Sequence, residues 1–216
     1  MKYSALIVAA GKGTRMGLGY NKMFYKLRKY GMTVLQKTTS IFMDDPRCAQ
    51  IVIVTNQSDM PKVVRNHENQ KIVHVNGGPT RQESVFLGLM AVSQDIVLIH
   101  DGARPWIDQE SIDRLVNAME HEKAAILAVK MKDTIKVIKD GYVEKTIDRE
   151  QLINAQTPQA FETGLIINAY LKIFNKNIQV FDDAQAVELV TDTKVKIVQG
   201  SYLNNKITTI DDIKNT

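Results

Sequence analysis

Residues 3–17 read Tyr-Ser-Ala-Leu-Ile-Val-Ala-Ala-Gly-Lys-Gly-Thr-Arg-Met-Gly, an apolar run that leads directly into a glycine-rich loop. The run from Tyr3 to Ala9 is typical of a β-strand that is covered on both faces. In an open α/β sheet, ligands bind outside the carboxyl ends of the strands, so this loop is the first place to expect a binding site. Its glycines let the backbone approach a phosphate closely, and Lys12 and Arg15 add positive charge.

The alternation of strand and helix continues along the chain. Short β-branched runs predict strands at residues 51–55, 71–75, 96–100 and 125–129. Segments of helical period predict helices at residues 33–43, 60–69, 81–93 and 112–120. This alternation implies βαβ units, so we expect an α/β fold with a mostly parallel sheet and helices on both faces.

Residues 134–148 break this pattern. Thr-Ile-Lys-Val-Ile is followed by Lys-Asp-Gly and then by Tyr-Val-Glu-Lys-Thr-Ile, which predicts two alternating strands about a tight turn. We expect a β-hairpin arm at about 134–149 that projects from the sheet. The sequence has no internal repeat, low-complexity tract or linker-like stretch, so residues 1–216 are expected to form a single domain.

Composition and charge exclude several classes of protein. The 28 basic and 24 acidic residues leave a net charge of +4 and are scattered, so we expect no nucleic-acid partner. The apolar stretch at residues 5–10 is far shorter than the ~20 residues that span a bilayer, and shorter than the core of a signal peptide. Cys48 is the only cysteine and has no metal-ligand spacing around it, so we expect it to be inert. These features predict a cytoplasmic protein with no membrane partner.

The spacing of the glycines narrows the class of ligand. Gly17 falls one residue late for G-x-G-x-x-G, and no Gly-Lys-Ser/Thr occurs, so the loop is neither a dinucleotide fingerprint nor a P-loop. An ordinary glycine-rich turn would explain the loop by itself. Lys22 follows shortly afterwards, however, and a lysine there could meet the same phosphates as Arg15, which favours phosphate binding.

Seven motifs, in order, carry a resemblance to the 2-C-methyl-D-erythritol 4-phosphate cytidylyltransferases over nearly the whole chain. They are Ala9-Ala-Gly-Lys-Gly-Thr-Arg15-Met-Gly, Gly77-Gly-Pro-Thr-Arg81-Gln-Glu-Ser84-Val, His100-Asp101-Gly-Ala-Arg104-Pro, Lys132-Asp-Thr134-Ile-Lys, Gln156-Thr157-Pro-Gln-Ala-Phe161, Asp182-Asp183-Ala and Asn204-Asn-Lys206-Ile-Thr. The resemblance implies a Rossmann-like nucleotidyltransferase fold and transfer of CMP from CTP to 2-C-methyl-D-erythritol 4-phosphate in non-mevalonate isoprenoid biosynthesis. It also implies release of pyrophosphate, Mg²⁺ as the cofactor, and a homodimer whose arms reach across the interface.

The resemblance further assigns roles to individual residues. The catalytic cations that it implies are Arg15, Lys22 and Lys206. The implied CTP site consists of Ala9, Ala10, Gly11, Gly13, Gly78, Arg81, Ser84, Asp101 and Gly102. The implied polyol-phosphate site consists of Asp101, Arg104, Thr134, Arg149, Thr157 and Lys206. Asp101 is also implied as a metal ligand, with Mg²⁺ held mostly through the phosphates of CTP.

Several of these residues also have a structural interpretation. Asp101 ends an apolar strand, where a carboxylate needs a partner, and a salt bridge with Arg104 would provide one without any ligand. Residues 77–84 are expected both to hold the cytosine ring and to lead into a helix that has Thr80 as its N-cap. His100 faces the opposite way from Asp101 on a strand, so we expect it to be structural.

The arm residue Arg149 also has both a functional and a structural interpretation. By resemblance, Thr134 and Arg149 act on the active site of the partner subunit. The alternative for Arg149 is a surface residue paired with Glu150 or Asp148 on a solvated loop.

The sequence departs from the family pattern at four positions, which are Asn21, Pro79, Ile153 and Ile210. Pro79 stands where an acidic residue is common, which weakens the assignment of side-chain contacts to cytosine. The nearest rival is ribitol 5-phosphate cytidylyltransferase, which shares the chemistry and differs in the polyol, but the segment 132–136 and Arg149 look more like the methylerythritol enzyme. A rival of another class is a non-catalytic nucleotide-binding protein.

Overall fold

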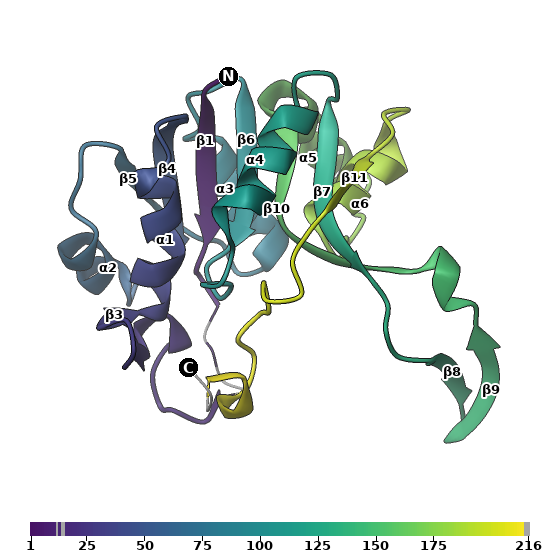
Figure 1. Cartoon of the computed structure of the whole chain (residues 1–216). Helices are drawn as coiled ribbons and strands as arrows, with labels where there is room; N and C mark the ends of the chain where they lie inside the picture. The colour runs from purple at the N-terminus through teal and green to yellow at the C-terminus, as the bar shows by residue number, and fades with distance from the viewer. Residues whose placement is uncertain (12, 14–15, 214–216) are drawn as a thin grey trace.

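A seven-stranded sheet forms the centre of the computed structural model, which describes residues 1–11, 13 and 16–213 (Figure 1). The strand order is β11-β7-β10-β6-β1-β4-β5. These strands are β1 (Tyr3–Val8), β4 (Cys48–Thr55), β5 (Ile72–Asn76), β6 (Ile96–Asp101), β7 (Ala124–Lys130), β10 (Ile153–Glu162) and β11 (Lys196–Gln199). Strand β10 runs antiparallel to both neighbours, β6 and β7, whereas the other pairs are parallel. The expectation of a mostly parallel sheet is confirmed.

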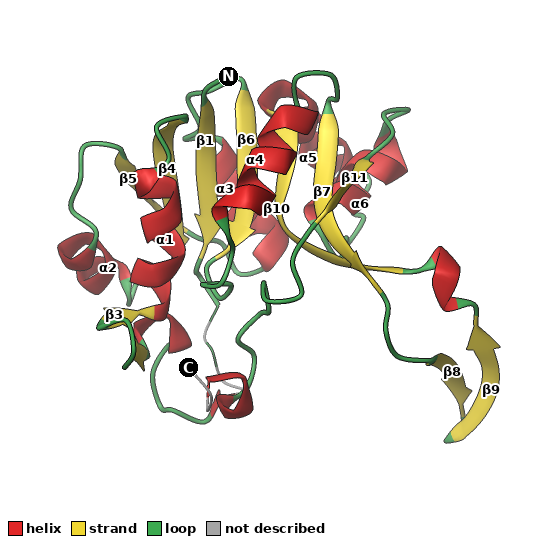
Figure 2. Ribbon diagram, in the orientation of Figure 1, coloured by secondary structure: helices red, strands yellow, loops and turns green. Residues whose placement is uncertain are grey.

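Helices cover both faces of this sheet (Figure 2). They are α1 (Val34–Asp44), α2 (Met60–Asn66), α3 (Arg81–Leu89), α4 (Gln109–Ala118), α5 (Thr163–Asn175) and α6 (Asp183–Val190). Outside the hairpin arm, the described chain also has short elements: β2 (Lys26–Leu27), β3 (Met32–Thr33) and the 3-10 helices η2 (Lys22–Phe24), η3 (Arg149–Gln151) and η4 (Ile210–Ile213). None of the helices described has the length and apolar character needed to cross a bilayer.

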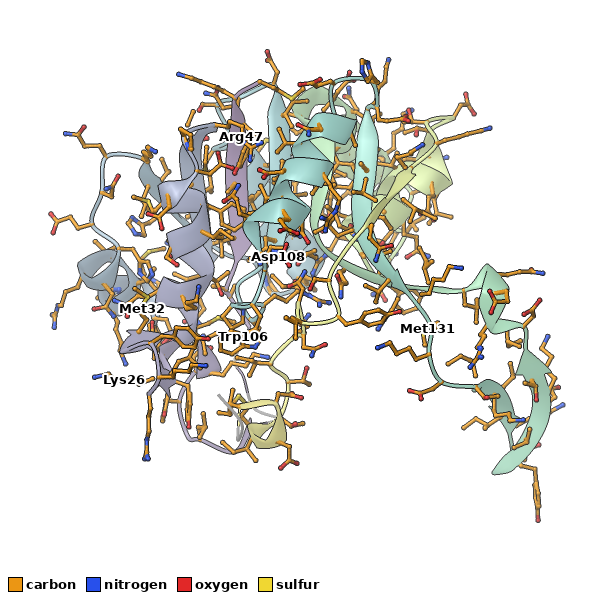
Figure 3. The ribbon with its side chains drawn as sticks, in the orientation of Figure 1. Lys26, Met32, Arg47, Trp106, Asp108 and Met131 are labelled. Atoms are coloured by element: carbon orange, nitrogen blue, oxygen red, sulfur yellow. The ribbon has the colours of Figure 1, made fainter. Side chains whose placement is uncertain are left out.

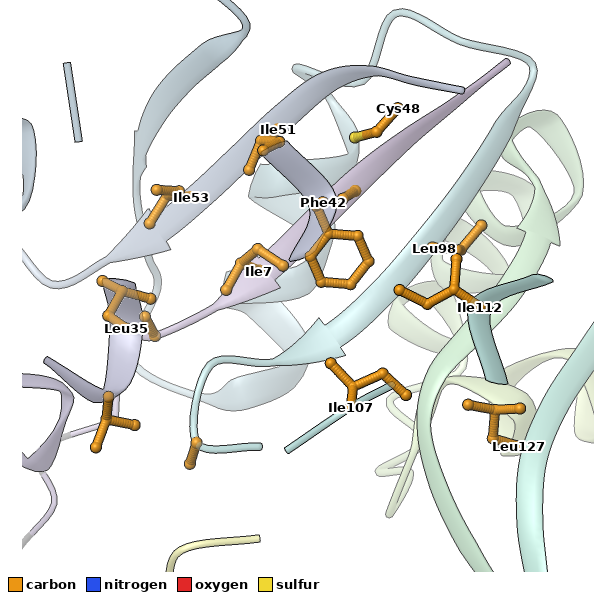
Figure 4. Packing of buried hydrophobic residues seen from close by; sticks show 14 of the residues in the cluster. Ile7, Leu35, Phe42, Cys48, Ile51, Ile53, Leu98, Ile107, Ile112 and Leu127 are labelled. Atoms are coloured by element: carbon orange, nitrogen blue, oxygen red, sulfur yellow. The ribbon is translucent and has the colours of Figure 1, made fainter. Parts of the chain in front are cut away.

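Successive residues of β1 pack into two different cores, as the period of a strand requires. Ile7 contributes to the core under α1 and α4, where it lies with Leu35 and Phe42 (Figure 4). Leu6 contributes to the core under α3, α5 and α6. Both side chains have no exposed surface, which explains why the strands read as continuous apolar runs.

Capping side chains determine where the helices begin. Thr80 accepts a hydrogen bond from Glu83 N, and the Glu83 carboxylate accepts one from Thr80 N, so the predicted N-cap of α3 is confirmed. Asp108, labelled in Figure 3, accepts a bond from Ser111 N. This cap starts α4 three residues before the predicted position of 112.

The predicted hairpin arm is confirmed. Strands β8 (Ile135–Lys139) and β9 (Tyr142–Ile147) pair antiparallel and project away from the main sheet (Figure 1). Asp140 and Gly141 connect them with φ angles of 49° and 84°, the left-handed conformation that tight hairpin turns need. The arm leaves Tyr142 80% exposed.

Candidate active site

A cleft of about 1360 Å³ opens at the carboxyl ends of the parallel strands, as expected for a sheet of this kind. Five segments of the described chain line it: the loop after β1, the region around η2, the loop at residues 56–59 between β4 and α2, the start of α3, and the C-terminal segment near Lys206. Asp101, the last residue of β6, lies among them. Ala10, Gly11 and Gly13 line the cleft as predicted, whereas Lys12 and Arg15 lie outside the described residues.

Three cationic side chains surround the Asp101 carboxylate. Lys206 Nζ lies 2.8 Å from Asp101 Oδ2, Arg104 Nε lies 3.5 Å from the same oxygen, and Arg81 Nη2 lies 3.8 Å from Oδ1. Burial alone would raise the pKa of Asp101, but the charges of Lys206, Arg81 and Arg104 outweigh it and hold that pKa far below its usual range. The expected salt bridge with Arg104 exists, but Lys206 is the nearer partner.

Lys22 is tied to the same C-terminal segment. Its Nζ donates a hydrogen bond to the carbonyl oxygen of Ile207 at 2.6 Å, and Ile207 N donates to the Ala103 carbonyl at 2.8 Å. Only 8% of Lys22 is exposed. Lys22 is therefore bonded to the residue that follows Lys206, although the two lysines are far apart in the sequence.

The loop before α3 is packed tightly at the edge of the cleft. A Cβ atom on Gly77 would lie 2.7 Å from Ala10 Cβ and 2.8 Å from Ser84 Oγ, so only glycine fits there. Gly78 N donates to Ser84 Oγ at 3.1 Å, and Ser84 Oγ donates to the Thr80 carbonyl at 2.8 Å. Ser84 thus shapes the loop, and its contact with a base remains a prediction.

Arg81 is held by the carboxylate of Asp183, a residue whose role does not follow from the sequence. Its Nη1 and Nη2 atoms lie 3.0 and 2.8 Å from the two oxygens of Asp183, which is fully buried. Tyr170 donates its hydroxyl hydrogen to Asp183, and the side-chain carbonyl of Gln159 accepts a bond from Asp183 N. The motif Asp182-Asp183-Ala was the signal for this clamp, but nothing in the sequence joins it to Arg81.

Ala9 and Gly102 lie behind the surface of the cleft. Ala9 is 1% exposed and donates its backbone hydrogen to Val54 O at 2.8 Å. A Cβ on Gly102 would lie 3.1 Å from Val8 O and 3.2 Å from Met23 Sδ. Both residues therefore set the shape of the floor, and contacts between their backbones and CTP remain predictions.

Thr157 is buried beneath Asp101. Its Oγ1 accepts a hydrogen bond from Asp101 N at 3.0 Å and contacts His100 Nδ1 at 2.9 Å. His100 points away from the cleft and packs edge-on against Phe42, with ring centroids 5.5 Å apart. Burial lowers the pKa of His100 to about 4. The location of His100 agrees with the structural role expected for it.

The arm residues do not reach the cleft of their own chain. Thr134 precedes β8, and Arg149 begins η3, beyond the hairpin. Arg149 Nη1 donates to the Lys132 carbonyl at 2.7 Å, and Glu150, one of its expected partners, instead lies 3.9 Å from Lys130. Neither Thr134 nor Arg149 is among the residues that line the cleft.

One of the four departures, Asn21, has a local explanation in the structure. Asn21 accepts a hydrogen bond from Met23 N and donates to Asp59 Oδ2, so it caps η2 where proline is common in the family. Pro79 lies on the wall of the cleft. Ile153 is 39% exposed where β10 begins, and Ile210 begins η4.

The cleft suits a multiply charged anion better than a metal ion alone. In residues 1–11, 13 and 16–213, no group of three or more His, Cys, Asp or Glu side chains lies close enough to hold a metal. Asp101 is a single carboxylate with cations around it. Mg²⁺ commonly binds through one or two carboxylates together with substrate phosphates, and Asp101 fits that pattern.

Comparison with known proteins agrees with this geometry. A sequence model of the family described as 2-C-methyl-D-erythritol 4-phosphate cytidylyltransferase matches residues 3–216. A protein of that name from Halalkalibacterium halodurans is 44% identical over 218 residues, covering 99% of this chain and 94% of the relative.

Solved structures also resemble the chain. The 4-diphosphocytidyl-2C-methyl-D-erythritol synthase from Anaerococcus prevotii aligns with a TM-score of 0.85 at 37% identity, covering 98% of this chain and 92% of that one. The 2-C-methyl-D-erythritol 4-phosphate cytidylyltransferase from Francisella tularensis aligns with a TM-score of 0.84 at 32% identity, covering 99% and 97%. The similarity therefore extends over the sheet, the cleft and the arm together.

Proposed function

The chain belongs to the 2-C-methyl-D-erythritol 4-phosphate cytidylyltransferase family and is a nucleotidyltransferase of isoprenoid biosynthesis, and from this premise we propose how its cleft works. It transfers the CMP part of CTP to 2-C-methyl-D-erythritol 4-phosphate and releases pyrophosphate. The observation that carries the proposal is the group of Lys206, Arg104 and Arg81 around Asp101, with Lys22 joined to the same segment.

The reaction needs positioning and positive charge more than an acid–base pair. A phosphate oxygen of the polyol attacks the α-phosphorus of CTP in line, and negative charge grows on that phosphorus and on the departing pyrophosphate. Lys22, together with Arg15, neutralises the triphosphate. Lys206 stabilises charge between the α-phosphate and the polyol phosphate, which is supported by its position at the edge of the cleft with 39% of its side chain exposed.

The base and the metal have separate places in this scheme. The segment around Gly78 and Ser84 holds cytosine, mainly through its backbone, and Arg81 borders the same wall. Asp101 would be the protein residue that holds Mg²⁺, together with the phosphates of CTP. When bound, Mg²⁺ supplies charge neutralisation for the triphosphate.

The polyol phosphate is gripped by both subunits of a homodimer. Arg104, Lys206 and Asp101 come from one chain, Thr134 and Arg149 come from the arm of the other, and Thr157 acts through Asp101. The arm supports this arrangement because it leaves its own cleft and exposes Ile138 and Tyr142, an apolar surface suited to a second copy. The buried, unpaired Cys48 fits work in the cytoplasm.

Release of pyrophosphate from CTP, measured separately with 2-C-methyl-D-erythritol 4-phosphate and with ribitol 5-phosphate, tests the proposed function. We expect rapid release with the first polyol and formation of its CDP-linked product. A marked preference for ribitol 5-phosphate would overturn the choice of polyol. Tight CTP binding without release from either would favour a non-catalytic nucleotide-binding protein.

A further inference from the structure

A connected set of hydrogen bonds lies beneath the Asp101–Lys206 pair. His100 is at its centre, with no exposed surface. Its Nε2 lies 3.1 Å from the Arg104 carbonyl oxygen, and its Nδ1 lies 2.9 Å from Thr157 Oγ1. Thr157 Oγ1 also accepts the hydrogen of Asp101 N.

These contacts determine the tautomer of His100. A carbonyl oxygen can only accept, so Nε2 must carry the hydrogen that it donates to Arg104. In a neutral ring, Nδ1 then has no hydrogen and must accept one from the Thr157 hydroxyl. Thr157 can give its single hydrogen to Nδ1 because the bond from Asp101 N uses an oxygen lone pair. The donor and the acceptor of each hydrogen bond from Asp101 N through Thr157 and His100 to Arg104 are therefore determined.

Asn204 closes the circuit from the other side. Its side-chain Nδ2 donates to the Thr157 carbonyl at 2.8 Å, and its backbone carbonyl oxygen accepts from Arg104 Nη1 at 2.7 Å. Asn204 is fully buried, and Lys206 follows two residues later. The same circuit thus holds the strand end that carries Asp101 and the segment that carries Lys206.

We propose that His100 is a positioning residue for this reaction: its neutral ring, held between Arg104 and Thr157, keeps Asp101 and Lys206 in register. This inference rests on the proposed function. His100 touches neither the cleft nor the lysine, so it acts only through its neighbours. Small displacements of groups that stabilise a transition state lower the rate strongly, which gives the circuit its importance.

Replacing the imidazole with an apolar aromatic ring provides the first test. His100→Phe keeps the packing against Phe42 and removes both hydrogen bonds. We expect kcat to fall about tenfold to a hundredfold while the KM for CTP changes less than about threefold, because Lys22 and the base-binding loop are left in place. His100→Asn and His100→Gln can each keep one of the two bonds and should lose less.

A double-mutant cycle tests the path through Thr157. Thr157→Ser keeps the hydroxyl and should retain most of kcat, whereas Thr157→Val should lose about as much as His100→Phe. If both act on the same circuit, the double variant should lose much less than the product of the two single losses. Fully multiplicative losses would overturn the proposed path.

A distant variant controls for loss of stability. Asp45→Asn breaks a buried network with Tyr3 and Arg47, away from the residues that line the cleft, and should lower the melting temperature with kcat unchanged well below it. Wild-type kcat in His100→Phe, or a fall in Asp45→Asn as large as in His100→Phe, would contradict a positioning role.

The tautomer can be measured without any activity. Nitrogen NMR of [15N]histidine-labelled wild-type protein, with His100 assigned by its absence in His100→Phe, should show a protonated Nε2 and a bare Nδ1 near neutral pH. Thr157→Val should shift the Nδ1 signal most. The opposite tautomer would overturn this inference, whereas absence of transfer by the wild-type protein would overturn the proposed function.

Discussion

Lys22 Nζ and the carbonyl oxygen of Ile207 lie 2.6 Å apart in a hydrogen bond that joins positions 185 residues apart. This bond brings the C-terminal segment across the cleft and sets Lys206 beside Asp101. The positive charge around the candidate reaction centre therefore comes from opposite ends of the chain. A change at either lysine should be felt at the other.

Lys206→Ala should lower kcat/KM about a hundredfold, because one electrostatic contact of this kind stabilises a transition state by ~3 kcal/mol. Steady-state kinetics with both substrates measures the loss. Lys196→Ala is the matched control and should behave as wild type. Lys196 is an exposed lysine of the edge strand β11, and its Nζ lies 3.8 Å from Glu122 Oε1. Normal kcat/KM in Lys206→Ala would refute its catalytic role.

Mixing two inactive variants tests whether the arms complete the partner's site. Arg149→Ala spoils the arm and Lys206→Ala spoils the cleft, so a heterodimer of the two keeps one intact site out of two. After mixing in equal amounts and random reassociation, we expect about a quarter of wild-type activity. If the mixture stays as inactive as its components, sites shared across the dimer are excluded.

Acid should weaken the fold through Asp45. Burial alone would raise the pKa of this carboxyl, but hydrogen bonds from Arg47, Tyr3 and Gln109 lower that pKa from 3.8 to about 2. A lowered pKa means stability that is complete above the unfolded value and is lost as the pH falls from about 4 to about 2. The contribution is about 2 kcal/mol.

Urea unfolding of wild type and Asp45→Asn across that range measures this contribution. The variant should be less stable at pH 7 and should lose less stability between pH 4 and pH 2. Arg47, labelled in Figure 3, bonds to both Asp45 oxygens, so Arg47→Met should reproduce much of the effect. Parallel pH profiles for wild type and Asp45→Asn would show that another group governs acid unfolding.

Cys48 should not react in the folded protein. It is 1% exposed, and burial raises the pKa of its thiol to about 11. At pH 8 we expect a disulfide reagent to modify it far more slowly in native protein than in urea, where the single thiol should react fully. Equal rates in the two states would mean that the strand around Cys48 opens readily.

The strands predicted from the sequence are the mainly apolar ones, and two strands of the main sheet, β10 and β11, were not predicted. Ile96 to His100 was predicted as a strand, and β6 spans Ile96–Asp101. Strand β10 was not predicted, because its centre contains Gln156, Thr157 and Gln159, all of which are buried. Their polar groups bond to residues far away in the chain, and no local pattern records such partners.

Helix ends show a related limit. The helix predicted at 81–93 ends at Leu89, and the one predicted at 60–69 ends at Asn66. Helices α5 and α6 were not predicted. The hairpin was predicted, because Asp140 and Gly141 are typical residues of a tight turn. A tight turn can be predicted because it depends on the residues within it, whereas the end of a helix depends on what its last turn packs against.

The sequence predicts which residues belong to the candidate site, but it does not predict which of them contact one another. Lys22, Arg81, Asp101 and Lys206 do line one cleft. Their mutual contacts depend on Asp183 and on the Ile207 carbonyl, which sequence patterns cannot pair with them. Tertiary folding alone sets these distances, so the sequence suggests Arg104 as the partner of Asp101, whereas Lys206 is the nearer one in the structure.

The carboxylate of Asp101 acts as an internal counter-ion for the cations of the cleft. A phosphate that binds here must compete with the Asp101 carboxylate for Lys206, Arg104 and Arg81. Binding is therefore an exchange of one anion for another at these cations. An ion with one charge on a single centre gains little from that exchange. A polyphosphate spanning the cleft would contact several cations at once, so we expect the cleft to bind a polyphosphate in preference to orthophosphate.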